Sequence, residues 1–439
     1  MSTTRRSFLT QSGKAIAATA MTASFPLFLS GKKYSPNDSI SIGLIGCRGM
    51  GFYNLENHLR QDNVICGGLC DVDQEILGKR TRDVEKITGK KPKQFKDFRR
   101  MLDDQEIDAV IIGTPDHWHC LMMSMACRSG KDVYVEKPMA NSIRECELMV
   151  RIARETGQVV QVGQQQRSGK HWQKVARLVQ NDRLGKIRRV RVWGNFNYGA
   201  GKPKVADSAP PNGLDYEMWL GPAARQAYNI NRHHGIWRMQ WPYGGGLLTD
   251  WGVHLIDIVL WAMNVQGAPQ SVVASGGIFH YPDHEIQTPD TLSVNWQFDD
   301  WLMSWEHVAG VEQGPYNRHY GIAFIGQKGS LIVNRDGFEL VPMSIDGKAQ
   351  TEAIPFQKGI TSNHERHAKN FLKAMRDRQD PICTVEMGYL AAFYAHMGNI
   401  AHRSQSRLVW NNEKGDFGKN KAANRLISPS YRKPWQLPV

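Results

Sequence analysis

The segment SIGLIGCRGMG, residues 41–51, decides the fold. A short apolar run that ends in a glycine-rich turn is typical of the first strand and phosphate-binding turn of a dinucleotide-binding domain. The usual spacing is G-x-G-x-x-G, and Gly46 and Gly51 occupy its first and third positions. Arg48 stands at the second position, where a glycine normally lets the backbone approach the pyrophosphate closely. The turn therefore predicts a nucleotide site with one unusual residue.

Strand-like and helix-like segments alternate from this turn as far as residue 163. Further strands are predicted over 63–73, 108–115, 132–138 and 159–163, and helices over 52–61, 74–89, 119–130 and 142–156. Strict alternation of this kind predicts parallel βαβ units in a doubly wound sheet. We therefore predict an α/β protein whose residues 37–165 form an NAD-binding Rossmann domain.

The pattern changes after residue 165. Strands are predicted over 186–196, 270–279, 290–298, 301–308, 320–335 and 337–342, and helices over 250–263, 362–379 and 384–403. Several of these strands alternate apolar and polar residues with period two, which favours an antiparallel sheet with one covered face. Residues 166–439 are therefore predicted to form an α+β domain with a large, mainly antiparallel open sheet.

The first 36 residues are typical of an export signal. Arg5 and Arg6 precede an apolar stretch rich in alanine, methionine and threonine, as in twin-arginine signals. The alternative is a frayed amphipathic N-terminal helix. No cysteine ends this stretch, and no later apolar run is long enough to span a membrane. We expect a periplasmic protein without a stable membrane anchor.

The composition is that of a soluble globular protein, with 41% hydrophobic and 22% charged residues in 439. The net charge is +13, but the basic residues are scattered and five of them lie in the leader. A nucleic-acid-binding protein usually concentrates them on one face, so we expect no such partner. None of the seven cysteines forms a C-x-x-C pair, and no H-E-x-x-H motif occurs. We therefore expect no metal.

Asp71 follows Gly51 by 20 residues and ends the second predicted strand. A carboxylate at that place accepts hydrogen bonds from the adenosine ribose and repels a 2′-phosphate. The spacing therefore indicates NAD rather than NADP. The alternative is a glycine-rich turn without a ligand.

Two further motifs, GTPDHWH (113–119) and EKP (136–138), follow predicted strands. Open α/β sheets bind ligands at the carboxyl ends of their strands, where Lys137 could orient and polarise a substrate oxygen. The alternative is a buried, purely structural Glu136–Lys137 neighbour pair. The predicted cofactor contacts are Gly46, Cys47, Arg48, Gly49, Met50, Gly51, Asp71, Thr114, Pro115, His117, His119, Glu136, Lys137 and Gln164.

The segment GGGLLTDWGVHLID, residues 244–257, predicts a helix after a triple glycine. Asp250 and His254 are four residues apart, so a regular helix would place both side chains on one face. A histidine can accept a hydroxyl proton near neutral pH, and a neighbouring carboxylate can orient it. A structural helical histidine is the alternative.

These motifs, in this order, resemble the Gfo/Idh/MocA superfamily of glucose-fructose oxidoreductase and inositol dehydrogenase. The resemblance implies a two-domain α/β fold, a tightly held nicotinamide cofactor and a homodimer or homotetramer. It also implies that Lys137, Asp250 and His254 act at the substrate. Arg48 departs from the pattern. It is compatible with a turn of negative φ, and its guanidinium either reaches a phosphate oxygen or points to solvent.

We expect an NAD-dependent dehydrogenase that oxidises a ring hydroxyl of a sugar or glycoside, with a 3-keto sugar as one product. His254 would take the hydroxyl proton, Lys137 would stabilise the developing oxyanion, and Asp250 would position the histidine or a neighbouring hydroxyl. Aromatic rings pack well against sugars. Weaker substrate candidates are Arg167, Trp172, Trp237, Arg238, Trp251 and Tyr316.

Export adds a requirement to this expectation: NAD that is loaded before export would have to stay bound and be regenerated in place. A second carbonyl sugar could take the hydride back. Two alternatives remain. One is an NAD-dependent glycosidase that acts by transient oxidation and elimination, although this chain has TDWGVH where such enzymes carry a Y-P-T-H-type segment. The other is a non-catalytic sugar-binding protein on the same fold.

Overall fold

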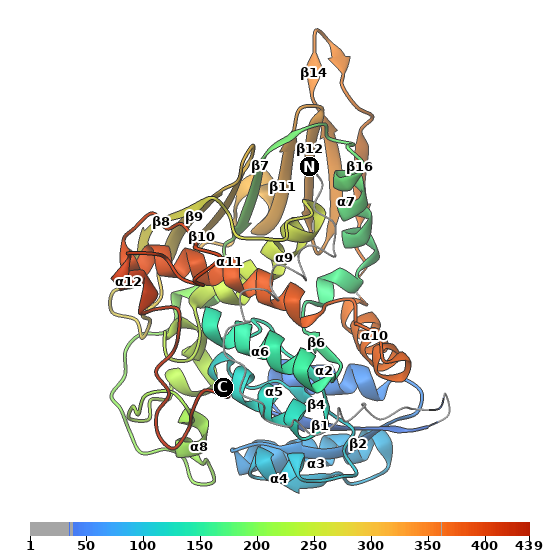
Figure 1. The fold of residues 1–439 in the computed structure, drawn as a ribbon, viewed down its shortest axis with the longest axis vertical. Coiled ribbons are helices and arrows are strands. Elements are labelled where there is room, and N and C mark those ends of the chain that lie inside the picture. Colours follow the sequence, from blue (N-terminus) through green and yellow to red (C-terminus); the bar gives the residue numbers. More distant parts are fainter. Residues whose placement is uncertain (1–34, 36–37, 361) are drawn as a thin grey trace.

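The computed structural model describes residues 35, 38–360 and 362–439, so the predicted export signal lies outside the described residues. Two sheets are stacked along the long axis of the molecule, with the helix Val385–Ser404 (α11) between them (Figure 1). Within the part of the chain that the structure describes, no helix combines the length and the apolar character needed to cross a membrane.

The first sheet has six parallel strands in the order β3-β2-β1-β4-β5-β6. Its strands are β1 Ile40–Ile45, β2 Val64–Cys70, β3 Lys93–Phe95, β4 Ala109–Ile112, β5 Asp132–Val135 and β6 Val160–Val162. The connecting helices are α2 Gly49–Leu59, α3 Gln74–Thr88, α4 Phe98–Leu102, α5 His119–Arg128 and α6 Ile143–Thr156. The predicted doubly wound parallel sheet is confirmed. The short elements β3 and α4 carry too few residues for a periodic signal and were not predicted.

The strand order reverses between β1 and β4, which opens a crevice at their carboxyl ends. Gly46 follows β1 and Gly113 follows β4. A Cβ on Gly51 would lie 2.2 Å from the Gly46 carbonyl oxygen, and a Cβ on Gly113 would lie 2.5 Å from the Gly51 Cα. Only glycines allow α2 to begin this close to both strands.

The second sheet has eight strands in the order β16-β13-β12-β11-β7-β10-β9-β8. They are β7 Ile187–Gly194, β8 Ser271–Gly277, β9 Thr291–Gln297, β10 Leu302–Val308, β11 Tyr320–Gly326, β12 Gly329–Asn334, β13 Gly337–Pro342 and β16 Ile354–Lys358. Only the β7–β10 pair is parallel, so the predicted mainly antiparallel sheet is confirmed. A small ribbon of β14 Ser344–Ile345 and β15 Lys348–Ala349 projects from one end (Figure 1).

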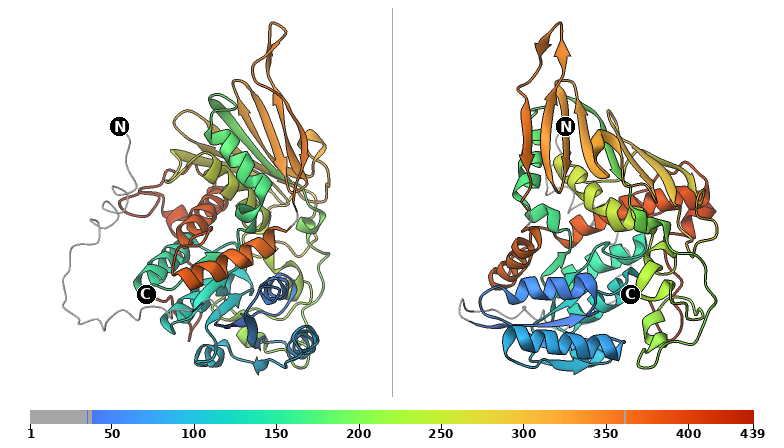
Figure 2. Two further views of the ribbon diagram at one scale, coloured as in Figure 1. Left: turned by 90° about the vertical axis from the view of Figure 1, so that its right-hand side faces the viewer. Right: turned by 180° about the vertical axis from the view of Figure 1, so that it is seen from behind.

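Helices cover one face of this second sheet (Figure 2). They are α7 Lys170–Gln180, α9 Val253–Ala262 and α11. The predicted helices over 250–263 and 384–403 match α9 and α11 closely, whereas α7 was not predicted. The covered face holds a large apolar core that includes Trp296 and Trp305, both fully buried.

The helix α10, Asn363–Asp377, leaves the second sheet and returns to the first domain. Its Phe371 and Met375 are fully buried in one cluster with Leu44 and Tyr134 of the Rossmann sheet. Phe371 lies edge-on to Tyr134, with ring centres 6.0 Å apart. The core of the first domain is therefore completed by residues far downstream.

This packing predicts a large loss of stability when Phe371 is truncated. Phe371→Ala should lower the free energy of unfolding by about 3–5 kcal/mol, because it removes a buried ring and leaves a cavity. Phe279, which is 69% exposed, provides the matched control. Phe279→Ala should change stability by less than about 0.5 kcal/mol. Denaturant unfolding measures both, and equal losses would contradict the assignment of α10 to the core.

Candidate active site

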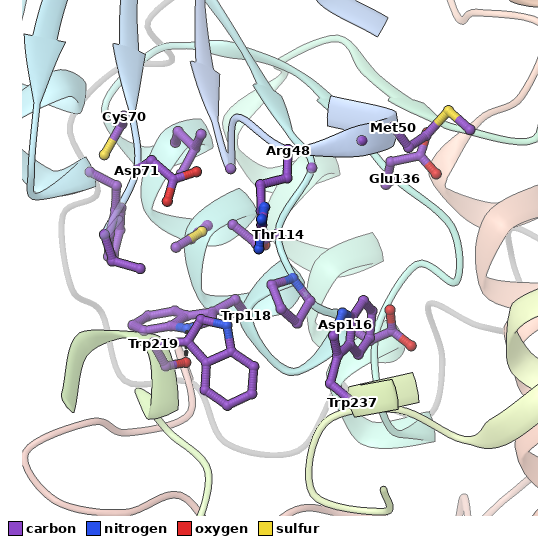
Figure 3. A pocket seen from close by; sticks show the side chains of 18 of the residues that line it. Arg48, Met50, Cys70, Asp71, Thr114, Asp116, Trp118, Glu136, Trp219 and Trp237 are labelled. Carbon is purple, nitrogen blue, oxygen red and sulfur yellow. Dashed lines mark hydrogen bonds between the residues drawn. The ribbon is translucent and has the colours of Figure 1, made fainter. Parts of the chain in front are cut away.

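A cavity of about 410 Å³ opens at the carboxyl ends of β1, β2 and β4 (Figure 3). The Rossmann domain forms one wall and residues 218–238 of the second domain form the other. The predicted cofactor residues that line it are Gly46, Arg48, Gly49, Met50, Asp71, Thr114, Pro115, Glu136 and Lys137. The cavity therefore occupies the crevice in which open α/β sheets bind nucleotides.

Asp71 fixes one end of the cavity. Its carboxylate accepts hydrogen bonds from the backbone N–H groups of Cys47, at 2.7 Å, and Asp73, at 2.9 Å. Burial raises the pKa of Asp71, and these two hydrogen bonds oppose that shift. Cys47 contributes its backbone here, because its thiol faces the carbonyl oxygen of Cys70 inside the domain. The carboxylate leaves no favourable place for a 2′-phosphate beside it.

Arg48 precedes the first turn of α2 with φ −90° and ψ 169°, an ordinary extended conformation for an L-residue. Its side chain reaches into the cavity toward Thr114 (Figure 3). No ion pair engages Arg48 among the residues described. A helix N-terminus and an unpaired guanidinium both attract an anion.

These features fit a dinucleotide. The close contact of Gly46 with Gly113 and Thr114 excludes side chains from the turn, since a Cβ on Gly46 would lie 2.8 Å from the Gly113 carbonyl carbon. The buried hydroxyl oxygen of Thr114 has no hydrogen-bond partner within the described chain. The turn, the arginine and the hydroxyl would hold the pyrophosphate, and Asp71 would hold the ribose.

Lys137 follows β5 and meets Asp250 of the second domain. The Lys137 Nζ donates to Asp250 Oδ1 at 2.6 Å and to the Asp250 carbonyl oxygen at 2.9 Å. Tyr198 donates its hydroxyl to Oδ2 at 2.5 Å, and Arg238 donates Nε to Oδ1 at 3.1 Å. Burial alone would raise the pKa of Asp250, but the cations Lys137 and Arg238 outweigh it and hold that pKa well below its usual range. Asp250 is thus ionised and accepts hydrogen bonds from three side chains.

His254 lies in the first turn of α9, and it does not form the expected contact with Asp250. Asp250 lies in a π-helical turn, Leu248–Gly252, ahead of that helix. The wider turn changes the register that an α-helix would give, and the Asp250 carboxylate bonds Lys137, Arg238 and Tyr198 instead of the histidine. The expectation that Asp250 orients His254 directly is not met.

The imidazole of His254 is buried and neutral. Burial lowers its pKa well below the usual value, and the charges of Lys137 and Arg335 lower it further. Its Nδ1 has no hydrogen-bond partner among the residues that the structure describes. A neutral imidazole with a free nitrogen can accept a proton at neutral pH.

Four predicted cofactor residues lie behind the cavity wall. The His119 ring lies between the carbonyl oxygens of Pro138, at 2.9 Å, and Thr114, at 3.0 Å. His117 Nε2 lies 3.1 Å from the Trp219 carbonyl oxygen. The remaining residues, Gly51 and Gln164, are a close-packing glycine of α2 and a buried amide near Val253. They position the loops that line the cavity.

The weaker substrate candidates divide into two groups. Trp237 and Arg238 line the cavity, and the Arg238 Cζ lies 4.2 Å from the centre of the Trp237 ring. Trp251 is half-buried at the second domain's edge of the site, stacked on Phe196 at 4.3 Å.

The other three candidates lie elsewhere. Arg167 is buried in an ion pair with Asp257 at 2.8 Å. Trp172 is fully buried in the core of the second domain. Tyr316 packs on Trp193, which points to the opposite face of the sheet from its core neighbour Val192.

The structure adds residues that the sequence patterns missed. Tyr198 lies in a 3₁₀ turn, Asn197–Ala200, after β7, and Arg335 follows β12, so neither stands in a recognisable motif. Asp116 lies inside the GTPDHWH motif, lines the cavity (Figure 3) and is 4% exposed. Burial raises the pKa of Asp116 well above its usual range. The position of Asp116 inside the GTPDHWH motif was the sequence signal that could have identified it as a site residue.

The far wall of the cavity is anchored by the C-terminal segment. The wall includes α8, Tyr216–Leu220, with Met218 and Trp219 facing the cavity. Arg432 donates to the Gly221 carbonyl oxygen at 3.0 Å and to the Glu217 carboxylate at 2.8 Å. Trp435 packs edge-on against Trp118 of the Rossmann domain, with ring centres 4.9 Å apart. The segment ties the wall to the nucleotide-binding domain.

Curated relatives of this chain differ in how much of it they match. The uncharacterized oxidoreductase YrbE of Bacillus subtilis (strain 168) is 22% identical over 84% of this chain and 95% of its own length. An alpha-N-acetylgalactosaminidase of Shewanella oneidensis is 26% identical over 54% of this chain, and the match spans 50% of that enzyme.

Solved structures share the whole architecture. Levoglucosan dehydrogenase in complex with NADH and levoglucosan has a TM-score of 0.63 at 18% identity, covering 85% of this chain and 99% of the other. The WlbA dehydrogenase of Bordetella pertussis, in complex with NADH and UDP-GlcNAcA, has a TM-score of 0.62 at 20% identity, with coverage of 85% and 99%. At these identities the likeness establishes a common fold.

Family models match both domains. Residues 40–164 match an oxidoreductase family with an NAD-binding Rossmann fold. Residues 168–283 and 351–437 match the C-terminal α/β domain of the same family. The fold, the nucleotide cavity and these two matches agree: the chain belongs to the Gfo/Idh/MocA oxidoreductase family, and its cofactor is NAD.

Proposed function

We propose that this oxidoreductase oxidises a ring hydroxyl of a sugar or glycoside. The observation that carries the proposal is the contact at 2.6 Å between Lys137, which lines the cavity, and Asp250, with the neutral His254 one helical turn beyond. Alcohol oxidation requires a group that stabilises the developing oxyanion and a base that accepts the hydroxyl proton, and a lysine and a histidine can fill these roles. An intact set of this kind argues against a purely sugar-binding role.

Bound NAD supplies the hydride acceptor for the carbon of that hydroxyl. The chain's own residues handle the oxygen and its proton. Lys137, held by Asp250, donates a hydrogen bond to the substrate oxygen and stabilises its developing negative charge. His254 accepts the hydroxyl proton. Tyr198 and Arg238 fix the Asp250 carboxylate and, through it, the lysine.

The sugar class is supported by two structural neighbours, which were solved with levoglucosan and with UDP-GlcNAcA. We propose a second candidate because curated relatives include the Shewanella alpha-N-acetylgalactosaminidase and glycosyl hydrolase family 109 proteins of up to 32% identity over shorter stretches. A glycosidase would use the same oxidation transiently and then eliminate the aglycone. Release of a chromophore from aryl glycosides, without net NADH, would favour that candidate.

We further propose that the protein is exported and keeps its NAD through repeated turnovers, with a second carbonyl sugar regenerating it. The twin arginine of the leader supports export. The anchored wall of Met218 and Trp219 supports retention, because it faces the phosphate turn across the cavity. Release of NAD at near one per chain, after purification and denaturation, is the expected result.

A homodimer or homotetramer is also proposed. Large apolar side chains on strands of the second sheet remain exposed, including Val273, Leu302, Val341 and Phe356 at 41–52%. Exposed apolar side chains on a sheet can contribute to a subunit interface.

Lys137→Ala should abolish reduction of bound NAD by sugar. Removal of one charge that stabilises an oxyanion typically costs about 10²–10³ in rate. Lys328, exposed and paired with Asp182, provides the control. Lys328→Ala should keep full activity. NADH absorbance after addition of sugars measures both variants, and unchanged turnover in Lys137→Ala would refute the role of this lysine.

The pH dependence should reflect the depressed pKa of His254. A base must be unprotonated to act, and His254 stays neutral well below the usual histidine pKa of about 6.5. The rate of NADH formation should therefore stay level as pH falls through about 6.5 and decline only at lower pH. A titration of the rate centred near the ordinary histidine pKa would contradict the buried, neutral imidazole.

Arg48→Gly restores the usual glycine but should weaken retention of NAD. Loss of a charge-assisted contact of about 1.5–3 kcal/mol corresponds to roughly 10- to 100-fold faster dissociation. The exposed Arg82 on α3 is the matched control. The dissociation rate is measured by exchange with labelled NAD. Identical rates in wild type and Arg48→Gly would mean that Arg48 points to solvent.

A further inference from the structure

Arg335 lies beside the candidate active site without an acidic partner. It follows Asn334, the last residue of β12, and its Nε donates to the Gln166 side-chain oxygen at 3.1 Å. Its Cζ lies 4.3 Å from the centre of the Trp251 ring. No carboxylate of the described residues lies within ion-pair distance of its guanidinium. These contacts orient the guanidinium, but among the described residues no carboxylate pairs with it directly.

Other arginines with little exposed side chain are paired. Arg167 contacts Asp257 at 2.8 Å, and Arg318 contacts Glu339 at 2.6 Å. Such pairing is expected, because removing a charge from water is costly unless a counter-charge compensates. Arg335 is half-buried, and this burial lowers its pKa. An external anion would supply the missing counter-charge.

Arg335 lies close to the proposed reacting groups Asp250 and His254 through its neighbours Trp251 and Gln166. Trp251, under its guanidinium, directly follows Asp250 and lies 5.9 Å from the His254 ring, centre to centre. Gln166, which orients Nε, also donates to the His254 carbonyl oxygen at 3.2 Å. The two cations nearer the cavity, Lys137 and Arg238, already share the Asp250 carboxylate. Arg335 is therefore a cation near His254 that has no carboxylate partner among the described residues and could bind a substrate group.

We propose that Arg335 binds a carboxylate of the substrate, so that the sugar oxidised here is a uronic acid or its glycoside. This inference rests on the proposed sugar oxidation and narrows its substrate class. A guanidinium stacked on an indole ring presents its remaining N–H groups at its edge. A planar carboxylate matches that edge with two parallel hydrogen bonds, whereas a neutral hydroxyl uses one of them and leaves the charge unbalanced.

The test compares methyl glucuronide with methyl glucoside on the purified protein with its own NAD. The KM for NADH formation should be about 10- to 100-fold lower for the acid, the factor that a charged hydrogen bond of about 1.5–3 kcal/mol supplies. Arg335→Gln should remove this preference by raising the KM of the acid toward that of the neutral sugar. Arg335→Lys should keep part of it. Arg188→Gln, at an exposed position on β7, should behave as wild type.

Three results would overturn the proposal. They are equal KM values for acid and neutral sugar in the wild type, an unchanged ratio in Arg335→Gln, and a clear preference for a sugar phosphate over the glucuronide. Thermal melting and bound NAD check that each variant is folded. Calorimetric titration with methyl glucuronide tests binding at Arg335 independently of the proposed oxidation. Binding that Arg335→Gln loses, without NADH formation from any sugar, would retain the anion site and reject the proposed oxidation.

Discussion

The ion pair between Lys137 and Asp250 joins the two domains at the point on which the site depends. Lys137 follows a strand of the Rossmann sheet, and Asp250 precedes the helix that carries His254. The pair is almost enclosed, with 11% and 12% of the two side chains exposed. Such a pair is costly to form unless its remaining hydrogen bonds are satisfied. Tyr198 and Arg238 satisfy them, so the same contacts fix the domain interface and the reacting groups.

The remaining parts of the site follow from this fixed interface. With the two domains held together, the phosphate turn of the first faces the wall of aromatic residues from the second across one cavity. The C-terminal segment then closes the contact through Arg432 and Trp435. Both domains therefore contribute walls of the cavity at their interface. A shift of either domain would alter both the cofactor region and the substrate region.

The sequence predicted what depends on local pattern. The alternation of strands and helices located the first sheet, and the period-two alternation of apolar and polar residues located the second. The glycine turn, Asp71, GTPDHWH and EKP reached the cavity, since each lies at a strand end. The predicted contact between Asp250 and His254 does not form, because a π-helical turn, which the sequence pattern does not reveal, changes the side-chain register within five residues. Tyr198 and Arg335 reach the site from segments without periodicity. Trp172 and Arg167 illustrate the reverse: an aromatic or a charge near a motif was buried for packing or pairing.

The return of α10 to the Rossmann domain has a consequence for how the chain folds. Phe371 and Met375 complete a core that includes Leu44, which lies more than three hundred residues earlier, and Tyr134, which lies more than two hundred residues earlier. Contacts of such long range close large loops and are typical of slow folding. The nucleotide-binding half cannot finish its core until the second half has been placed. The two domains are therefore distinct in architecture but share one core, so that the nucleotide-binding domain depends on the second domain for part of its buried surface.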